Sequence, residues 1–309
     1  MTRFIQDLLI QLSKQLKLSN VKNFKSIICL LILLSIPNFF YGQTIPYSIG
    51  RIVVSSDGNE HDHDDWAATP FTLAFLAAKN LQDSLTVYTF SDHIWGSNKT
   101  HSDGKKQMLI SALEGKEIYH FNNTDFIEAV EDSSKAINAI TKEINKSSKK
   151  SPLTIIAAGP MQVVGSAIDR ADVTKLKYVR IISHSNWNND HSDKPYEWEH
   201  HSGWTLNEIK ENFEPKGLIV DRIIDQNGGI DYEGMKAPME MFEWIKTTPI
   251  RENSFETQKQ LDWLYSRQLT CVKKGDFDPS DAGMIIYLLT GKQKTNPDQA
   301  KAIIESFVD

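Results

Sequence analysis

The chain has 309 residues, of which 40% are hydrophobic and 24% are charged, a composition typical of a globular protein with one sizeable core. This composition excludes collagen-like, coiled-coil and wholly disordered chains. The 34 Lys and Arg residues face 40 Asp and Glu residues, and no long basic stretch interleaves with aromatic residues. We therefore expect no nucleic-acid partner.

The N-terminal segment has the order of charged, apolar and small residues that is typical of a secretory signal. Lys22 and Lys25 precede an apolar run over 26–37, which leads to Gly42. The run is shorter than the roughly 20 residues that span a bilayer, so a membrane anchor is the weaker alternative. We predict that residues 1–42 are a signal peptide with an N-terminal extension, that residues 43–309 form a single domain, and that the protein is secreted or periplasmic.

After the signal, short β-rich runs alternate with longer segments of helical period. In chain order, the sequence predicts strands over 51–55, 85–90, 118–121, 153–157, 178–182 and 217–223. It predicts helices over 65–79, 105–113, 125–144, 161–171, 206–213, 238–245, 257–269, 281–289 and 297–307. Such alternation is typical of βαβ units. The predicted fold class is α/β, with a mostly parallel central sheet and helices on both faces.

The segment that follows the first predicted strand is rich in metal-ligand side chains. It holds Asp57, Glu60, His61, Asp62, His63, Asp64 and Asp65. Ligands of open α/β sheets gather at the carboxyl ends of the strands, and so many like charges repel one another unless a cation offsets them. Oxygen ligands favour Ca²⁺ or Mg²⁺, while the histidines leave zinc or manganese open. The alternative is an acidic loop that caps the next helix.

A second acidic cluster, residues 276–281, precedes an apolar helix. Asp281 stands where that helix is predicted to begin. Its carboxylate has two interpretations, a plain helix N-cap or a metal ligand.

Together these features resemble the calcium-dependent nucleoside hydrolases and their exported relatives, over residues 51–289. The shared features are the aspartate-rich turn, the Gly159-Pro160 turn after a strand reading Leu-Thr-Ile-Ile-Ala-Ala, and a late aspartate that opens an apolar helix. The resemblance implies a nucleoside hydrolase-like, Rossmann-like fold and a bound Ca²⁺. The implied calcium ligands are Asp57 or Glu60, Asp64, Asp65, the carbonyl of Ala158, and Asp281.

The same resemblance implies a reaction in which a calcium-activated water loses its proton to a first-loop carboxylate and attacks an anomeric carbon. We choose Asp57 as this catalytic base, because it comes directly after the first strand. Ser280 stands where many nucleoside hydrolases have the histidine that assists the leaving base. That difference favours a second hypothesis, a non-catalytic or polysaccharide-associated carbohydrate-binding protein of the same fold.

Substrate-binding candidates follow the second and fifth predicted strands. Asn98 resembles the asparagine of a Gly-Asn turn that contacts the sugar in the family, and indoles stack well on sugar faces. The candidates are His93, Trp95, Asn98, His184, Asn186, Trp187, Glu199 and Trp204. The function we expect is cleavage of a glycosidic bond, N-ribosyl or related, in a small-molecule glycoside or carbohydrate. Another divalent metal and a homo-oligomer are left open.

Overall fold

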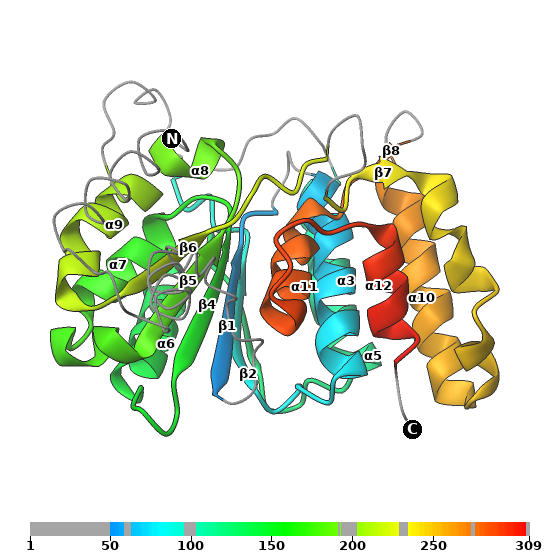
Figure 1. Cartoon of the computed structure of the whole chain (residues 1–309), viewed down its shortest axis with the longest axis horizontal. Helices are drawn as coiled ribbons and strands as arrows, with labels where there is room; N and C mark the ends of the chain where they lie inside the picture. Colours follow the sequence, from blue (N-terminus) through cyan, green and yellow to red (C-terminus); the bar gives the residue numbers. More distant parts are fainter. Residues whose placement is uncertain are drawn as a thin grey trace, which may run out of the picture. The chain divides into compact units, whose positions relative to one another are not determined.

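A six-stranded sheet, in which every neighbouring pair of strands is parallel, forms the centre of the computed structural model (Figure 1). Its strands are β1 (Arg51–Ser56), β2 (Leu85–Phe90), β3 (Asp125–Glu128), β4 (Leu153–Ala158), β5 (Val179–Ser183) and β6 (Ile219–Arg222). Their order is β3-β2-β1-β4-β5-β6. The direction of winding therefore reverses between β1 and β4, and a ligand crevice is expected outside the carboxyl ends of these two strands.

The structure describes residues 50–58, 63–95, 103–190, 192, 203–228, 234–272 and 276–306. The predicted signal peptide lies outside these ranges. Residues Ile45–Asp309 form one compact unit. Within the described ranges, no helix combines the length and the apolar character that crossing a membrane requires.

Helices cover both faces of the sheet, which confirms the predicted α/β class. In Figure 1, α6 (Ser133–Asn145), α7 (Gln162–Arg170) and α9 (Leu206–Phe213) lie on one side. On the other side lie α3 (His63–Ala78), α10 (Phe255–Cys271), α11 (Gly283–Thr290) and α12 (Pro297–Ile304). The remaining helical segments are α4 (Gly104–Leu109), η1 (Ile110–Glu114), α5 (Gly115–Ile118), η2 (Val173–Tyr178), α8 (Trp187–Asp190), η3 (Glu214–Lys216), η4 (Met239–Lys246), η5 (Pro249–Glu252) and η6 (Ser280–Ala282). A short antiparallel pair joins β7 (Ala237–Pro238) to β8 (Asp276–Phe277).

The strands are apolar on both faces, because each face packs against a layer of helices. In β1, Ile52 and Val54 belong to the core on the α3 side, while Val53 belongs to the core on the α6 and α7 side. All three side chains are 0–2% exposed. This double burial fixes the register of β1 and with it the position of the residue that follows the strand.

Helix α3 is apolar on nearly all sides, and a helix of that kind is buried. It packs against α10, α11 and α12, and every residue from Asp65 to Ala78 is buried. The ring of Phe71 lies 5.6 Å from that of Phe242 and 5.8 Å from that of Phe277. These contacts hold the first turn of α3 in place at the carboxyl edge of the sheet.

The predicted third strand is wrong, and the helix after it begins later than predicted. Residues 118–121, predicted as a strand, begin at the end of α5, and Tyr119 packs beneath α10, where its hydroxyl donates to the Gln260 carbonyl at 3.3 Å. The strand is instead Asp125–Glu128, which was predicted as the start of a helix. Its side chains alternate, since Phe126 stacks on Tyr88 with 5.2 Å between ring centroids and Ile127 lies in the opposite core. Helix α6 begins only after Asp132, whose carboxylate accepts the Lys135 N–H.

Candidate metal centre

Three aspartates that are distant in sequence meet at the carboxyl edge of the sheet. Asp57 follows β1, Asp65 lies in the first turn of α3, and Asp281 lies in η6. Each offers a carboxylate oxygen, and these oxygens all lie within 4.8 Å of one another. The cluster therefore forms beside the reversal point of the sheet, where the fold predicts a ligand.

Asp57 is held by its own backbone and by two strand ends. Its N–H donates to the Ala158 carbonyl at 2.9 Å, which ties the end of β1 to the end of β4. Its Oδ1 accepts the Gly58 N–H at 3.0 Å, and its Oδ2 accepts from His93 Nε2 at 3.3 Å. The side chain lies directly over Gly159, where a Cβ would come within 2.5 Å of the Asp57 Cβ. Gly159 also has a φ of +120°, so both the lack of space and the backbone conformation require glycine there.

Asp65 presents a buried carboxylate oxygen toward the cluster. Its side chain is 1% exposed, and its Oδ1 accepts from Ser56 Oγ at 2.9 Å. Its Oδ2 accepts no hydrogen bond within the described part of the chain. A buried carboxylate oxygen without a partner is costly, so this oxygen fits the coordination of a cation. Asp64 is not one of the three clustered aspartates; its Oδ1 accepts the Asp65 N–H at 3.2 Å.

Asp281 does not cap the apolar helix, so that interpretation is wrong. Helix α11 begins at Gly283, and the Asp281 carboxylate accepts instead from His184 Nε2 at 2.6 Å. Just before η6, Asp278 Oδ1 accepts the Ser280 N–H at 3.2 Å. The carboxylate of Asp281 is thereby left facing the other two aspartates.

The three carboxylates cannot all carry a charge at low cost. Burial and the charge of Asp57 raise the pKa of Asp65 well above its ordinary value, and burial raises the pKa of Asp281. Burial would raise the pKa of Asp57 as well, but hydrogen bonds from Asp65 and His93 hold it well below its usual range. Asp65 and Asp281 therefore hold their protons more readily than ordinary carboxyl groups do, and Asp57 holds its proton less readily. A divalent cation would replace those protons and remove the repulsion.

Among the described residues, the side-chain donors of the cluster are carboxylate oxygens. Besides the three carboxylates, the Ala158 carbonyl lies beside Asp57. The two buried imidazoles at this edge, His93 and His184, direct their Nε2 atoms at carboxylates. Hard cations such as Ca²⁺ and Mg²⁺ prefer an all-oxygen set, whereas zinc prefers histidine and cysteine. The arrangement therefore fits the predicted calcium better than a transition metal.

Two of the predicted substrate-binding residues lie against the aspartates. His93 and His184 are 3% and 2% exposed, and each follows a strand of the sheet. Non-glycine residues in the left-handed region stand beside them, Ser91 with a φ of 56° and Ser185 with a φ of 71°. Such backbone strain occurs most often at functional sites.

Two predicted tryptophans have packing contacts. The Trp204 ring lies 5.3 Å from that of Phe213, and its side chain fills the space over Gly165 of α7. The Trp95 ring packs over Gly203. These indoles anchor the ends of the segments that follow β2 and β5.

The other predicted residues divide between the surface and the undescribed segments. Asn186 Oδ1 accepts from Arg222, and the N–H of Trp187 donates to Ser185 Oγ at 3.2 Å. Trp187 opens α8, a helical turn that follows β5. Glu60, Asn98 and Glu199 lie outside the described residues.

Asp92 is a buried residue of this edge that was not among the candidates. It is 1% exposed, and its Oδ2 accepts from Ser55 and from Thr89 Oγ1, the latter at 3.1 Å. Burial raises its pKa to about 7. Its position directly after β2 was the available signal, because strand ends place side chains at this edge.

The pKa shifts predict how stability depends on pH without a cation. Asp65, Asp281 and Asp92 have raised pKa values in the folded protein and ordinary ones, near 3.8, when unfolded. These groups stabilise the folded protein at pH values below their pKa in the unfolded chain. That stabilisation is lost as the pH rises through their pKa in the folded protein. The melting temperature in chelator should therefore fall as the pH rises above the ordinary carboxyl range and through about 7, the pKa of Asp92 in the folded protein.

Added calcium should have the opposite pH dependence, because protons and the cation compete for the same carboxylates. The calcium-induced rise in melting temperature should grow with pH over the same window. Thermal unfolding with and without chelator measures both trends. A calcium-induced rise that shrank with pH would contradict this assignment.

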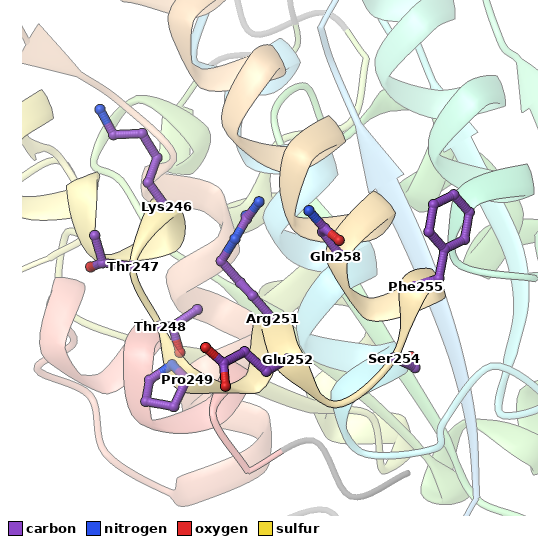
Figure 2. Close-up of a pocket in the computed structure, with 9 residues that line it drawn as sticks. All are labelled: Lys246, Thr247, Thr248, Pro249, Arg251, Glu252, Ser254, Phe255 and Gln258. Carbon is purple, nitrogen blue, oxygen red and sulfur yellow. The ribbon is translucent and has the colours of Figure 1, made fainter.

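A surface pocket of about 610 Å³ lies elsewhere, around η5 and the start of α10 (Figure 2). Its lining residues are Lys246, Thr247, Thr248, Pro249, Arg251, Glu252, Ser254, Phe255 and Gln258. The start of α10 lies toward the amino edge of the sheet. There Gln260 Nε2 donates to the carbonyl of Ile118, a residue that precedes β3 in the chain, at 3.0 Å. Two basic residues that line the pocket form ion pairs, Lys246 with Glu243 and Arg251 with Asp262. The pocket is therefore separate from the aspartate cluster.

This chain is similar to a bacterial protein along most of its length. The chain matches no family model. It is 28% identical over 274 residues to a protein of Formosa agariphila that is described as uncharacterized, and the match covers 84% of this chain and 92% of that protein. The similarity thus extends over most of both chains.

Proposed function

We propose that the protein is a calcium-dependent hydrolase of the nucleoside hydrolase type, which cleaves an N-ribosyl or related glycosidic bond of a small molecule. The observation that carries the proposal is the convergence of Asp57, Asp65 and Asp281 within 4.8 Å, at the reversal point of the sheet. These three carboxylates and the Ala158 carbonyl would hold the ion. The resemblance of the surrounding segments to that family supports the choice of reaction.

Asp57 is the residue that would accept the proton of the attacking water. Hydrogen bonds from Gly58 and His93 keep its carboxylate ionised and fix its orientation. A carboxylate with so low a pKa is a weak base. The bound cation would supply what Asp57 lacks, because it lowers the pKa of water and polarises sugar hydroxyls. Asp65 and Asp281, ionised once the cation replaces their protons, would balance its charge.

A specific observation favours the second candidate function, carbohydrate binding without turnover. Ser280, the neighbour of Asp281, is 1% exposed, and its hydroxyl donates to Asn227 Oδ1 at 3.4 Å. A serine in this position is a poor acid for a departing base. The two functions therefore differ in whether a leaving group departs.

Hydrolysis assays on two kinds of substrate test the proposal. Nitrophenolate leaves without protonation, so we expect calcium-loaded protein to cleave p-nitrophenyl β-D-ribofuranoside faster than a nucleoside. Chelator should abolish the activity, and Asp57→Asn should lower the rate by on the order of 10²–10⁴, the usual contribution of a general base. Asp172→Asn is the matched control, because Asp172 caps η2 before β5 and Asn caps equally well.

The outcomes separate the hypotheses. Equal rates in calcium and in chelator would contradict the metal-dependent mechanism. Binding of an oligosaccharide in calorimetry, with no product from any substrate, would favour the carbohydrate-binding function instead.

A further inference from the structure

His184 occupies a position from which it can control one of the three clustered carboxylates. It follows β5, its side chain is 2% exposed, and its Nε2 lies 2.6 Å from Asp281 Oδ1, across 97 residues of sequence. Among the described residues, no side chain caps the start of α11, so Asp281 is not held there as a helix cap. The imidazole is therefore the contact that orients this carboxylate.

The surroundings of the ring fix which of its atoms carries the proton. In the neutral ring, the N–H of Gln226 donates to Nδ1 at 3.2 Å, so the proton lies on Nε2. In the imidazolium, Nδ1–H faces Asp225 Oδ1, 3.6 Å away. Nε2 carries a proton in both forms and donates to Asp281 in both. The hydrogen bond to the carboxylate therefore does not depend on the charge of His184.

Gln226 is itself anchored on several sides, which makes the imidazole a fixed support. Its side chain is 0% exposed, and its Nε2 donates to the carbonyls of Ile224 at 2.7 Å and Gln293 at 2.8 Å. Its Oε1 accepts from Thr295 Oγ1 at 2.5 Å. A Cβ added at Gly283, two residues after Asp281, would lie 2.5 Å from this Oε1. Gln226 thus contacts both the histidine and the start of α11.

We propose that His184 is a positioning residue, which presets the Asp281 carboxylate for the cation and is held in turn by Gln226. This inference rests on the proposed metal-dependent function, but it assigns His184 no contact with substrate. Hydrogen-bonded partners of metal ligands typically change metal affinity 10–100-fold when they are removed. The same size of effect is expected here.

Two substitutions of similar size separate the hydrogen bond from the volume of the ring. His184→Gln keeps an N–H donor near the position of Nε2, whereas His184→Met fills the space without a donor. Isothermal titration with calcium should show affinity roughly 10–100-fold weaker for His184→Met than for the wild type. His184→Gln should retain most of the affinity.

A spectroscopic measurement distinguishes positioning from a general loss of structure. Terbium(III) binds calcium sites, and its luminescence decay in H₂O and D₂O reports how many water molecules coordinate the ion. We expect an additional coordinated water in His184→Met, because a misplaced Asp281 leaves a coordination position open, and no change in His184→Gln. If His184→Met does not fold, nitrogen NMR of the wild type decides, since calcium should shift the signal of the His184 Nε2–H.

Each result supports or overturns one statement. Equal calcium affinity in His184→Met and the wild type, or a His184 signal that calcium leaves unmoved, would overturn the positioning role alone. Absence of calcium binding by the wild type would overturn the proposed function and the positioning role with it.

Discussion

Replacing Asp281 with Asn is expected to remove most of the stabilisation that calcium gives the protein. A ligand at a thousand times its Kd stabilises the folded state by about 4 kcal/mol, which is on the order of 10 °C for a chain of this size. Loss of one charged ligand should weaken binding by about a hundredfold or more, since even the partners of ligands are worth 10–100-fold. At the same calcium concentration the variant would then gain only about 1.4 kcal/mol.

The experiment compares melting temperatures with calcium and with chelator. In chelator, Asp281→Asn should be at least as stable as the wild type, because Asn retains an acceptor for His184 and removes a buried carboxyl group whose ionisation is costly. Asp172→Asn serves again as the control for the loss of one negative charge. Equal calcium-induced shifts in Asp281→Asn and the wild type would exclude Asp281 from the metal site.

Gly159→Ala is expected to damage both the fold and the metal centre. A left-handed φ of +120° strains any residue with a Cβ, and this Cβ would lie 2.5 Å from the Cβ of Asp57. Strain and overpacking together should cost about 2–5 kcal/mol. Because the clash pushes Asp57 away from Asp65 and Asp281, calcium affinity should fall as well.

Gly217→Ala is the matched control for this change. Gly217 has a φ of +99°, and the nearest atom to an added Cβ is the Lys177 Cβ at 3.0 Å, just before β5 and far from the carboxyl edge. Gly217→Ala should lower the free energy of unfolding by about 1–3 kcal/mol through backbone strain, without loss of calcium affinity. Urea unfolding in chelator measures the first effect and calcium titration the second. Unchanged calcium affinity in Gly159→Ala would contradict the close packing of Asp57 on Gly159.

The parts of the fold that the sequence predicts well are those with an unambiguous hydrophobic period. The buried strands β1, β2, β4 and β5 and the apolar helix α3 lie within two or three residues of their predicted bounds. The segment around β3 was wrong because four residues are too few to distinguish a strand from the start of a helix. The stacking of Phe126 on Tyr88 favours the strand in this segment, and a contact between residues so far apart cannot be read from the local sequence.

The candidate site divides in the same way. The strand ends predicted that Asp57 and Asp65 would lie at the ligand edge, and the resemblance added Asp281; their role as ligands stays a prediction. The local sequence left Asp281 between a cap and a ligand, because that choice depends on His184, 97 residues away. For the same reason no sequence pattern revealed that His93 and His184 support carboxylates or that Gln226 anchors a ring.

The separation of Asp57 from Asp281 along the chain also has a kinetic consequence. Their carboxylates come within 4.8 Å only when β1, α3 and η6 have packed together. Closing so long a loop has a cost in chain entropy, and we expect the cation to bind only after that cost has been met. An interaction that is absent from the transition state slows unfolding and leaves the folding rate unchanged. A cation bound in this centre would therefore prolong the lifetime of the folded state without accelerating folding.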